Sequence, residues 1–166
     1  MSRIVPFKLV CCAIVALSVS RAEAQMPNPY GANIGADNAK KAAASALAEA
    51  RKNNWTMAAA IVDTAGDLVY FEKIDGTQTG SVKVAVNKAR AATLFKRPTK
   101  VFQDILAAGG DGLRVYGIEG VVPVEGGVPL LVDGKIVGAI GVSGGSSSQD
   151  GVAAKAGADS LAPAAK

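Results

Sequence analysis

The stretch from Gly126 to Asp150 constrains the fold more than any other part of the chain. It holds two apolar runs separated by Asp133-Gly134, a strong hairpin signal because both central turn residues need positive φ. The second run, residues 136–142, is nearly continuous in apolar residues, which is typical of a strand buried on both faces. Gly138 and Gly141 lie inside it, and glycine in a strand marks a bulge or a close approach by another backbone. We therefore expect a helix, a second subunit or a ligand to pack closely on this strand.

The N-terminus has the organisation of a signal peptide. Arg3 and Lys8 supply a positive region, and residues 9–19 form an apolar core that is shorter than the roughly 20 residues of a membrane span. Ala22-Glu23-Ala24 then matches an A-x-A cleavage site. We expect removal of residues 1–24 and a periplasmic or secreted protein with no membrane span after cleavage. An uncleaved anchor is the alternative.

The rest of the chain divides into a flexible leader at residues 25–33, one domain at residues 34–162 and a tail at residues 163–166. Apolar periodicity within the domain indicates an α+β fold in which helices pack on an antiparallel sheet. The expected helices are residues 37–52, 81–96, 99–108 and a last helix from Ser147, and the expected strands form hairpins over residues 55–74 and 126–142, with a further short strand at residues 121–124.

Composition removes several kinds of chemistry. The chain has no histidine, and its two cysteines, Cys11 and Cys12, lie in the signal segment. This excludes Cys-His and Ser-His nucleophilic sites and the common Cys/His zinc sites. Catalysis, if present, would depend on Asp, Glu, Lys, Tyr or a bound cofactor, and no catalytic residue is assigned. The formal net charge is only +4 and no basic stripe is interleaved with aromatics, so we expect no nucleic-acid partner.

The loop at residues 141–149 is rich in glycine and serine and leads into the last helix. Exposed N–H groups at a helix start attract anions, so the loop could hold a carboxylate or phosphate. It lacks the lysine of a P-loop and does not match G-x-G-x-x-G, so it is a weak nucleotide signal. Ser147 with Asp150 fits a capping box. We expect this helix to turn Val152, Ala153, Ala156 and Leu161 toward the core.

The helix expected at residues 81–96 carries several basic side chains away from its predicted apolar face. We expect these side chains to form a solvated cationic surface, with contact to ligand carboxylates as the alternative. They are Lys83, Lys88, Arg90 and Lys96.

Several short motifs occur together along the domain: Val62-Asp63-x-x-Gly66, Ile74-Asp75-Gly76, Lys88-Ala89-x-x-Ala92, Arg97-Pro98-Thr99, Gly126-Gly127-Val128-Pro129 and residues 138–144 followed by Gln149-Asp150. In this combination the chain resembles the GlcG/HbpS family of haem-binding and haem-utilisation proteins, which includes the C-terminal domain of PduO-type adenosyltransferases. The resemblance implies a five-stranded antiparallel sheet flanked by helices, of the profilin/roadblock type. It also implies homo-oligomers, from dimers to octamers.

The resemblance further implies an exported protein that binds haem for sequestration, delivery or iron release. Histidine is the usual proximal haem ligand, and its absence leaves Thr99 as the candidate ligand to the iron, with Thr93 as a second candidate. Tyr70 is a candidate for stacking on the porphyrin. The candidates for contact with the haem propionates are Lys88, Arg90, Lys96 and Arg97.

Two other functions remain open. The first is an enzyme or accessory factor that acts on a small organic acid or aldehyde in glycolate or diol metabolism, with the glycine-rich loop holding the carboxylate. The second is a structural oligomeric module, because helix faces made of small residues suit close packing between subunits.

Overall fold

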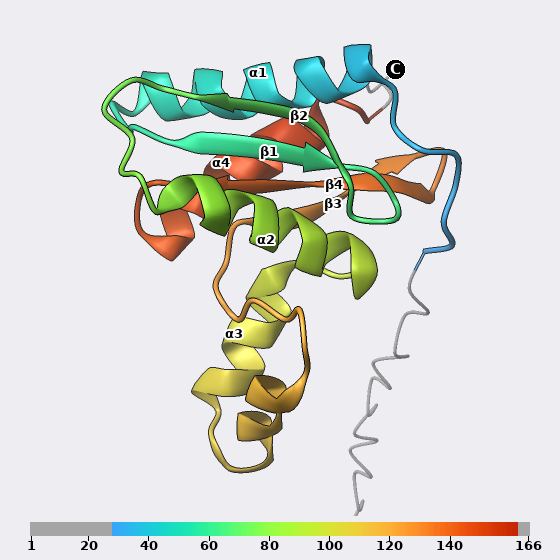
Figure 1. Cartoon of the computed structure of the whole chain (residues 1–166), viewed down its shortest axis with the longest axis vertical. Helices are drawn as coiled ribbons and strands as arrows, with labels where there is room; N and C mark the ends of the chain where they lie inside the picture. The colour runs from blue at the N-terminus through green and yellow to red at the C-terminus, as the bar shows by residue number, and fades with distance from the viewer. Residues whose placement is uncertain (1–27, 163–166) are drawn as a thin grey trace, which may run out of the picture.

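The structure is a computed structural model, and it describes residues 28–162. The expected signal peptide, Cys11, Cys12 and the tail at residues 163–166 lie outside the described residues. In chain order, the elements are α1 (Ala36–Lys52), β1 (Ala58–Val62), β2 (Leu68–Lys73), α2 (Ser81–Leu94), α3 (Thr99–Ala107), the 3₁₀ helix η1 (Gly110–Gly117), β3 (Gly127–Val132), β4 (Lys135–Ser143) and α4 (Ser147–Asp159). The predicted α+β class with an antiparallel sheet flanked by helices is confirmed (Figure 1).

The sheet has four strands in the order β2-β1-β4-β3, and each neighbouring pair is antiparallel. The expectation of five strands is therefore wrong. The segment expected to supply the extra strand, residues 121–124, is irregular. Gly120 before it has a φ of +81°, and Pro123 within it has no N–H to donate to a strand ladder.

Helices cover both faces of the sheet. α1 and α4 pack on one face and against each other, and α2 packs on the other face (Figure 1). A Cβ added to Gly157 of α4 would lie 2.7 Å from the Ala42 carbonyl oxygen, so α1 and α4 approach closely. The buried face of α1 follows the helical period and consists almost wholly of alanine: Ala39, Ala42, Ala43, Ala46, Leu47 and Ala50.

The helix α2 contacts β4 most closely at Gly141. A Cβ at Gly141 would collide with the Ala85 carbonyl oxygen and lie 2.5 Å from the Ala89 nitrogen. A Cβ at Gly138 would collide with the Val62 carbonyl oxygen of the neighbouring strand β1. The predicted close approach to this strand is confirmed, and the partners are a helix and a strand of the same chain.

The segment Thr99–Val124, here called the arm, contains α3 and η1 and extends away from the sheet (Figure 1). It is anchored at its base, where Phe95 and Phe102 pack edge to face with ring centroids 5.5 Å apart. Gly109 lies between its two helices and has a φ of +68°, the left-handed conformation that commonly follows the end of a helix.

Residues 29–34, which include part of the expected leader, run beside β4. Ile136 donates its N–H to Pro29 O at 2.9 Å, and Gly31 donates to Ile136 O at 2.8 Å. The Tyr30 hydroxyl donates to the Thr93 carbonyl at 2.8 Å and so joins this segment to the end of α2. No helix within residues 28–162 has the length and apolar character needed to cross a membrane.

Candidate ligand-binding site

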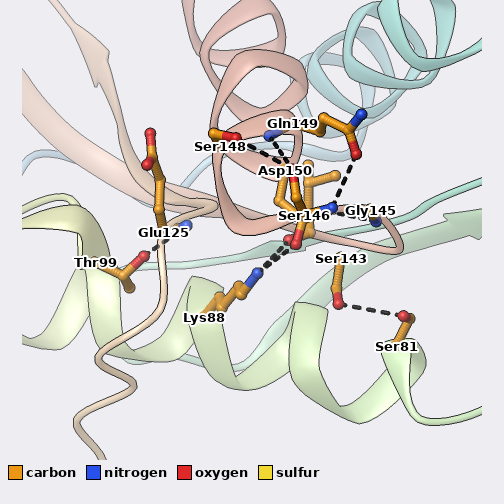
Figure 2. A network of polar contacts seen from close by, with 12 residues as sticks. Ser81, Lys88, Thr99, Glu125, Ser143, Gly145, Ser146, Ser148, Gln149 and Asp150 are labelled. Carbon is orange, nitrogen blue, oxygen red and sulfur yellow. Dashed lines mark hydrogen bonds and ion pairs between the residues drawn. The ribbon is translucent and has the colours of Figure 1, made fainter. Parts of the chain in front are cut away.

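A buried ion pair joins α2 to the start of α4 (Figure 2). Lys88 Nζ lies 2.7 Å from Asp150 Oδ2, and the two side chains are only 1% and 4% exposed. Lys88 also donates to the Val142 carbonyl at 3.2 Å, and Asp150 Oδ1 accepts the Gly145 N–H at 3.0 Å. The pair therefore fixes both helices to the end of β4.

Burial raises the pKa of Asp150 above its ordinary value, even though Lys88 and the Gly145 N–H both favour the carboxylate. Desolvation thus outweighs these two favourable interactions. A buried pair of this kind adds little net stability, but losing one partner leaves a charge buried without compensation. We interpret the pair as a device that fixes the position of α2 and α4.

The burial of Lys88 contradicts its expected place on a solvated cationic surface. A signal for its burial is present in the sequence. Ser81, Ala85, Lys88 and Ala92 follow one another at intervals of four, three and four residues, which places them on one helix face. All four are buried against the sheet. Lys88 does not look like part of the apolar face of this helix, because lysine is almost never fully buried unless it is paired.

The glycine-rich loop is closed by its own side chains. Ser146 caps α4, and Gln149 completes the capping box by accepting the Ser146 N–H at 2.9 Å. The predicted box of Ser147 and Asp150 is wrong by one residue, because Asp150 is held by Lys88 and Gly145. The N–H groups of Gly145 and Ser146, which could have met a carboxylate ligand, already have partners (Figure 2).

Thr99 lies beside the ion pair and next to Gly127, the first residue of β3. Its side chain is buried, and its hydroxyl accepts the Gly127 N–H at 2.9 Å. Pro98 is the N-cap of α3, and Thr99 is the first residue of that helix. A Cβ at Gly127 would lie 2.6 Å from Thr99 Cγ2, and a Cβ at Gly126 would lie 2.9 Å from Lys88 Nζ. The two glycines thus let the chain pass directly over Lys88 and Thr99.

Gly126 and Gly127 also form part of the wall of a groove of about 430 Å³, here called the β3–α4 groove. Most of its lining consists of glycine, proline and aliphatic residues from β3, the base of the arm and the last turns of α4. Two basic residues, Lys100 and Lys155, line the groove. Neither is among the candidate residues predicted from the sequence. The lining is Pro98, Lys100, Glu125, Gly126, Gly127, Val128, Pro129, Leu131, Gly151, Lys155, Ala158, Asp159 and Ala162.

The candidate threonines occupy different surroundings. Thr99 does not line the groove, but its neighbours Pro98 and Lys100 and its hydrogen-bond partner Gly127 do. Thr93 is fully buried in α2. Within the part of the chain that the structure describes, its Oγ1 is a buried side-chain oxygen without a hydrogen-bond partner.

The other basic candidates lie apart from the groove. Arg90 donates to the Gly66 carbonyl at 3.0 Å, in the turn between β1 and β2. Lys96 Nζ lies 4.3 Å from the centre of the Tyr30 ring. Arg97 stands over the Phe102 ring, with 5.7 Å between its Cζ and the ring centroid. The structure therefore brings together only Lys88 and Thr99 from the predicted set.

Tyr70 lies on the edge strand β2 and packs against the core that α1 covers, so it faces away from α2. Its hydroxyl donates to Glu72 Oε2 at 3.1 Å, and this contact raises the pKa of Tyr70. Among residues 28–162, no cluster of three or more His, Cys, Asp or Glu side chains is placed to hold a metal ion.

The chain belongs to the HbpS-like family, because the family model described as haem degrading protein HbpS-like matches residues 34–159. Protein GlcG of Escherichia coli (strain K12) is 36% identical over 95 residues, which cover 57% of this chain and 69% of GlcG. The predicted GlcG/HbpS membership is confirmed.

Two solved structures share the fold. A crystal structure of HbpS is 30% identical with a TM-score of 0.73, and the match covers 80% of this chain and 93% of that one. A crystal structure of a PduOC:heme complex has a TM-score of 0.69 at 24% identity, over 78% of this chain and 95% of that one. At that identity the second likeness concerns the fold alone.

Proposed function

We propose that this protein binds haem, and that the β3–α4 groove receives it. The observation that carries the proposal is an apolar groove of about 430 Å³ with two lysines at its wall, Lys100 and Lys155. Haem combines a flat apolar macrocycle with two propionate carboxylates, so it needs both features. The HbpS-like family and the haem complex of a relative with the same fold support the choice of ligand.

The charged lining of the groove consists of two lysines and two acids, Glu125 and Asp159, so a propionate would bind where a lysine exchanges its partner. Lys100 pairs with Asp104 at 2.8 Å, and Lys155 pairs with Asp159 at 2.5 Å. Both pairs are largely exposed, and an exposed pair contributes about 0–1 kcal/mol. Each lysine can therefore exchange its aspartate for a propionate at small cost. Val128, on the β3 side of the groove, offers an apolar wall to the macrocycle.

The groove offers less to the haem iron than to the macrocycle and the propionates. The chain has no histidine, and the Thr99 hydroxyl is held by the Gly127 N–H. Ligation by Thr99 would require that hydrogen bond to be exchanged for the iron. Bound haem would supply a redox-active iron, whereas the chain's own part is to hold the macrocycle and the propionates. We therefore favour sequestration or delivery of haem as the role.

The groove also distinguishes this proposal from binding of a small organic acid. That alternative placed a carboxylate at the start of α4, where Asp150 and Gln149 already accept the N–H groups of Gly145 and Ser146. We further propose that the protein is exported, because Ala22-Glu23-Ala24 follows a signal-like apolar run, and that it self-associates. Cell fractionation with N-terminal sequencing tests export: recovery outside the cytoplasm with a start at Gln25 supports it, and recovery only in the cytoplasm with a start at Met1 contradicts it.

A hemin titration followed by Soret absorbance tests the proposal. We expect saturable binding at micromolar hemin, weakened about tenfold, or ~1.4 kcal/mol, in the double variant Lys100→Ala/Lys155→Ala. The matched control is Lys40→Ala/Lys83→Ala, which removes the same charge from exposed lysines outside the groove. A flat titration of the wild type would end the haem proposal. Equal weakening in both double variants would show attraction by net charge and contradict the groove.

A further inference from the structure

Apolar side chains on the arm are exposed to an unusual extent. Of the twelve large apolar side chains that are exposed within residues 28–162, six lie between Thr99 and Val124. They are Val101 (37% exposed), Ile105 (39%), Leu113 (56%), Tyr116 (73%), Ile118 (45%) and Val124 (40%). The arm extends away from the sheet (Figure 1), and each of the six side chains is more than one third exposed.

The helix α3 presents apolar residues on two sides. Phe102 turns inward and is 5% exposed. Val101 and Ile105 are one helical turn apart and more than one third exposed. The backbone of Gly112 in η1 lies against Ile105, so the two helices of the arm are in contact at this side. Leu113 and Tyr116 are three residues apart in a 3₁₀ helix and so share one face.

The amount of surface matches an interface. The six side chains expose roughly 500 Å² of apolar surface, a large part of the ~800 Å² that each partner buries in a standard interface. The groove begins at the base of the arm, since Lys100 and Glu125 line it, and this adds further apolar surface next to the patch. Tyrosine is enriched among the residues that dominate binding energy, and Tyr116 is the most exposed of the six.

The charges of the arm favour a second copy of the same chain as the partner. In a two-fold contact each surface meets itself, so a high net charge would repel. The arm carries two basic and three acidic residues, and four of these pair with each other, Lys100 with Asp104 and Arg114 with Asp111. We infer that the arm is a self-association surface, and that its exposed apolar side chains pack against the arm of a second copy. This deepens the self-association proposed above and is independent of haem.

Sedimentation of the full chain over a concentration series tests this inference. We expect the wild type to associate and the double variant Leu113→Asp/Tyr116→Asp to dissociate, with a dissociation constant raised at least about a hundredfold. The control Leu68→Asp/Val84→Asp adds the same charge at exposed apolar positions on β2 and α2, and it should associate like the wild type.

The outcomes separate this inference from the others. A wild type that is monomeric at all concentrations overturns both self-association and the arm interface. An associated arm variant overturns the arm interface alone. The arm variant should still titrate with hemin, and its circular dichroism should match the wild type. If it fails to fold, the single variant Tyr116→Ser replaces it: association weakened about tenfold supports the inference, and unchanged association overturns it.

Discussion

Lys88 Nζ and Asp150 Oδ2 lie 2.7 Å apart although 62 residues separate them in the chain. Lys88 comes from the helix on one face of the sheet, and Asp150 comes from the helix on the other face. The bond passes the end of β4, where Gly126 crosses over the ammonium group. One buried pair thus joins the two helical layers and fixes the inner wall of the β3–α4 groove.

Replacement of Lys88 by methionine should destabilise the protein by about 3 kcal/mol near neutral pH, because it leaves Asp150 buried without its cation. Urea unfolding followed by Trp55 fluorescence measures this loss. The double variant Lys88→Met/Asp150→Asn leaves no buried charge and retains an acceptor for Gly145, so it should recover most of the stability. No recovery in the double variant would contradict the account.

The same single variant should respond to pH. Burial already raises the pKa of Asp150, and loss of Lys88 removes a group that opposes this rise. The folded carboxyl then keeps its proton at a pH where the unfolded chain has released it, so unfolding releases a proton. The stability of Lys88→Met should therefore fall as the pH rises above about 4, the ordinary pKa of an aspartate, and more steeply than that of the double variant. Parallel pH profiles would disprove this.

Thr99→Val should cost about 1–3 kcal/mol, because it leaves the buried Gly127 N–H without an acceptor in a side chain of similar shape. Thr99→Ser retains the hydroxyl and should lose much less. The pair also separates structure from ligation: if Thr99 binds the haem iron, Thr99→Val alters the hemin spectrum at saturation and Thr99→Ser does not. Identical spectra for both variants would exclude Thr99 as a ligand.

Ser146→Ala should destabilise the protein by about 1 kcal/mol, because Ser146 caps α4. Ser147→Ala changes the neighbouring residue, which has no capping contact, and should stay within about 0.5 kcal/mol of the wild type. Thermal melts of the two variants give the comparison. A larger loss for Ser147→Ala would place the cap at the residue first predicted from the sequence.

Gly141→Ala should cost at least about 1–3 kcal/mol, because its methyl group collides with the Ala85 carbonyl and must push α2 away from the sheet. Gly80→Ala is the control: an added Cβ there has no neighbour within 4 Å, and the backbone is already helical. Melting temperatures that differ little between the two variants would refute the close approach.

The sequence was sufficient for elements that have a local cause. The alanine stripe of α1 and the Asp133-Gly134 hairpin follow from spacing and turn chemistry, and the structure confirms both. Asp63 accepts the N–H groups of Ala65 and Asp67, which is a typical contact of a turn carboxylate. In each case the residues that decide the conformation are close neighbours in the chain.

The predictions were wrong where the position of a side chain depends on a residue far away in the chain. From the sequence, Asp150 fits a capping box, but in the structure it pairs with Lys88 and the cap of α4 is Ser146. With Asp150 facing inward, the phase of α4 is set, so Gly151 and Ala154 are buried and Val152 is exposed. The groove could not be predicted either, because its walls come from β3, the base of the arm and α4, which meet only in the folded chain.

The strand order has a consequence for synthesis. β1 pairs with β4, and α1 packs on α4. The first strand and the first helix therefore lack one of their packing partners until β4 and α4 have been synthesised. When the ribosome has made residues 1–126, β1 has only β2 beside it, and a two-stranded hairpin is marginally stable in water. The domain therefore acquires its central strand pair only after β4 has emerged.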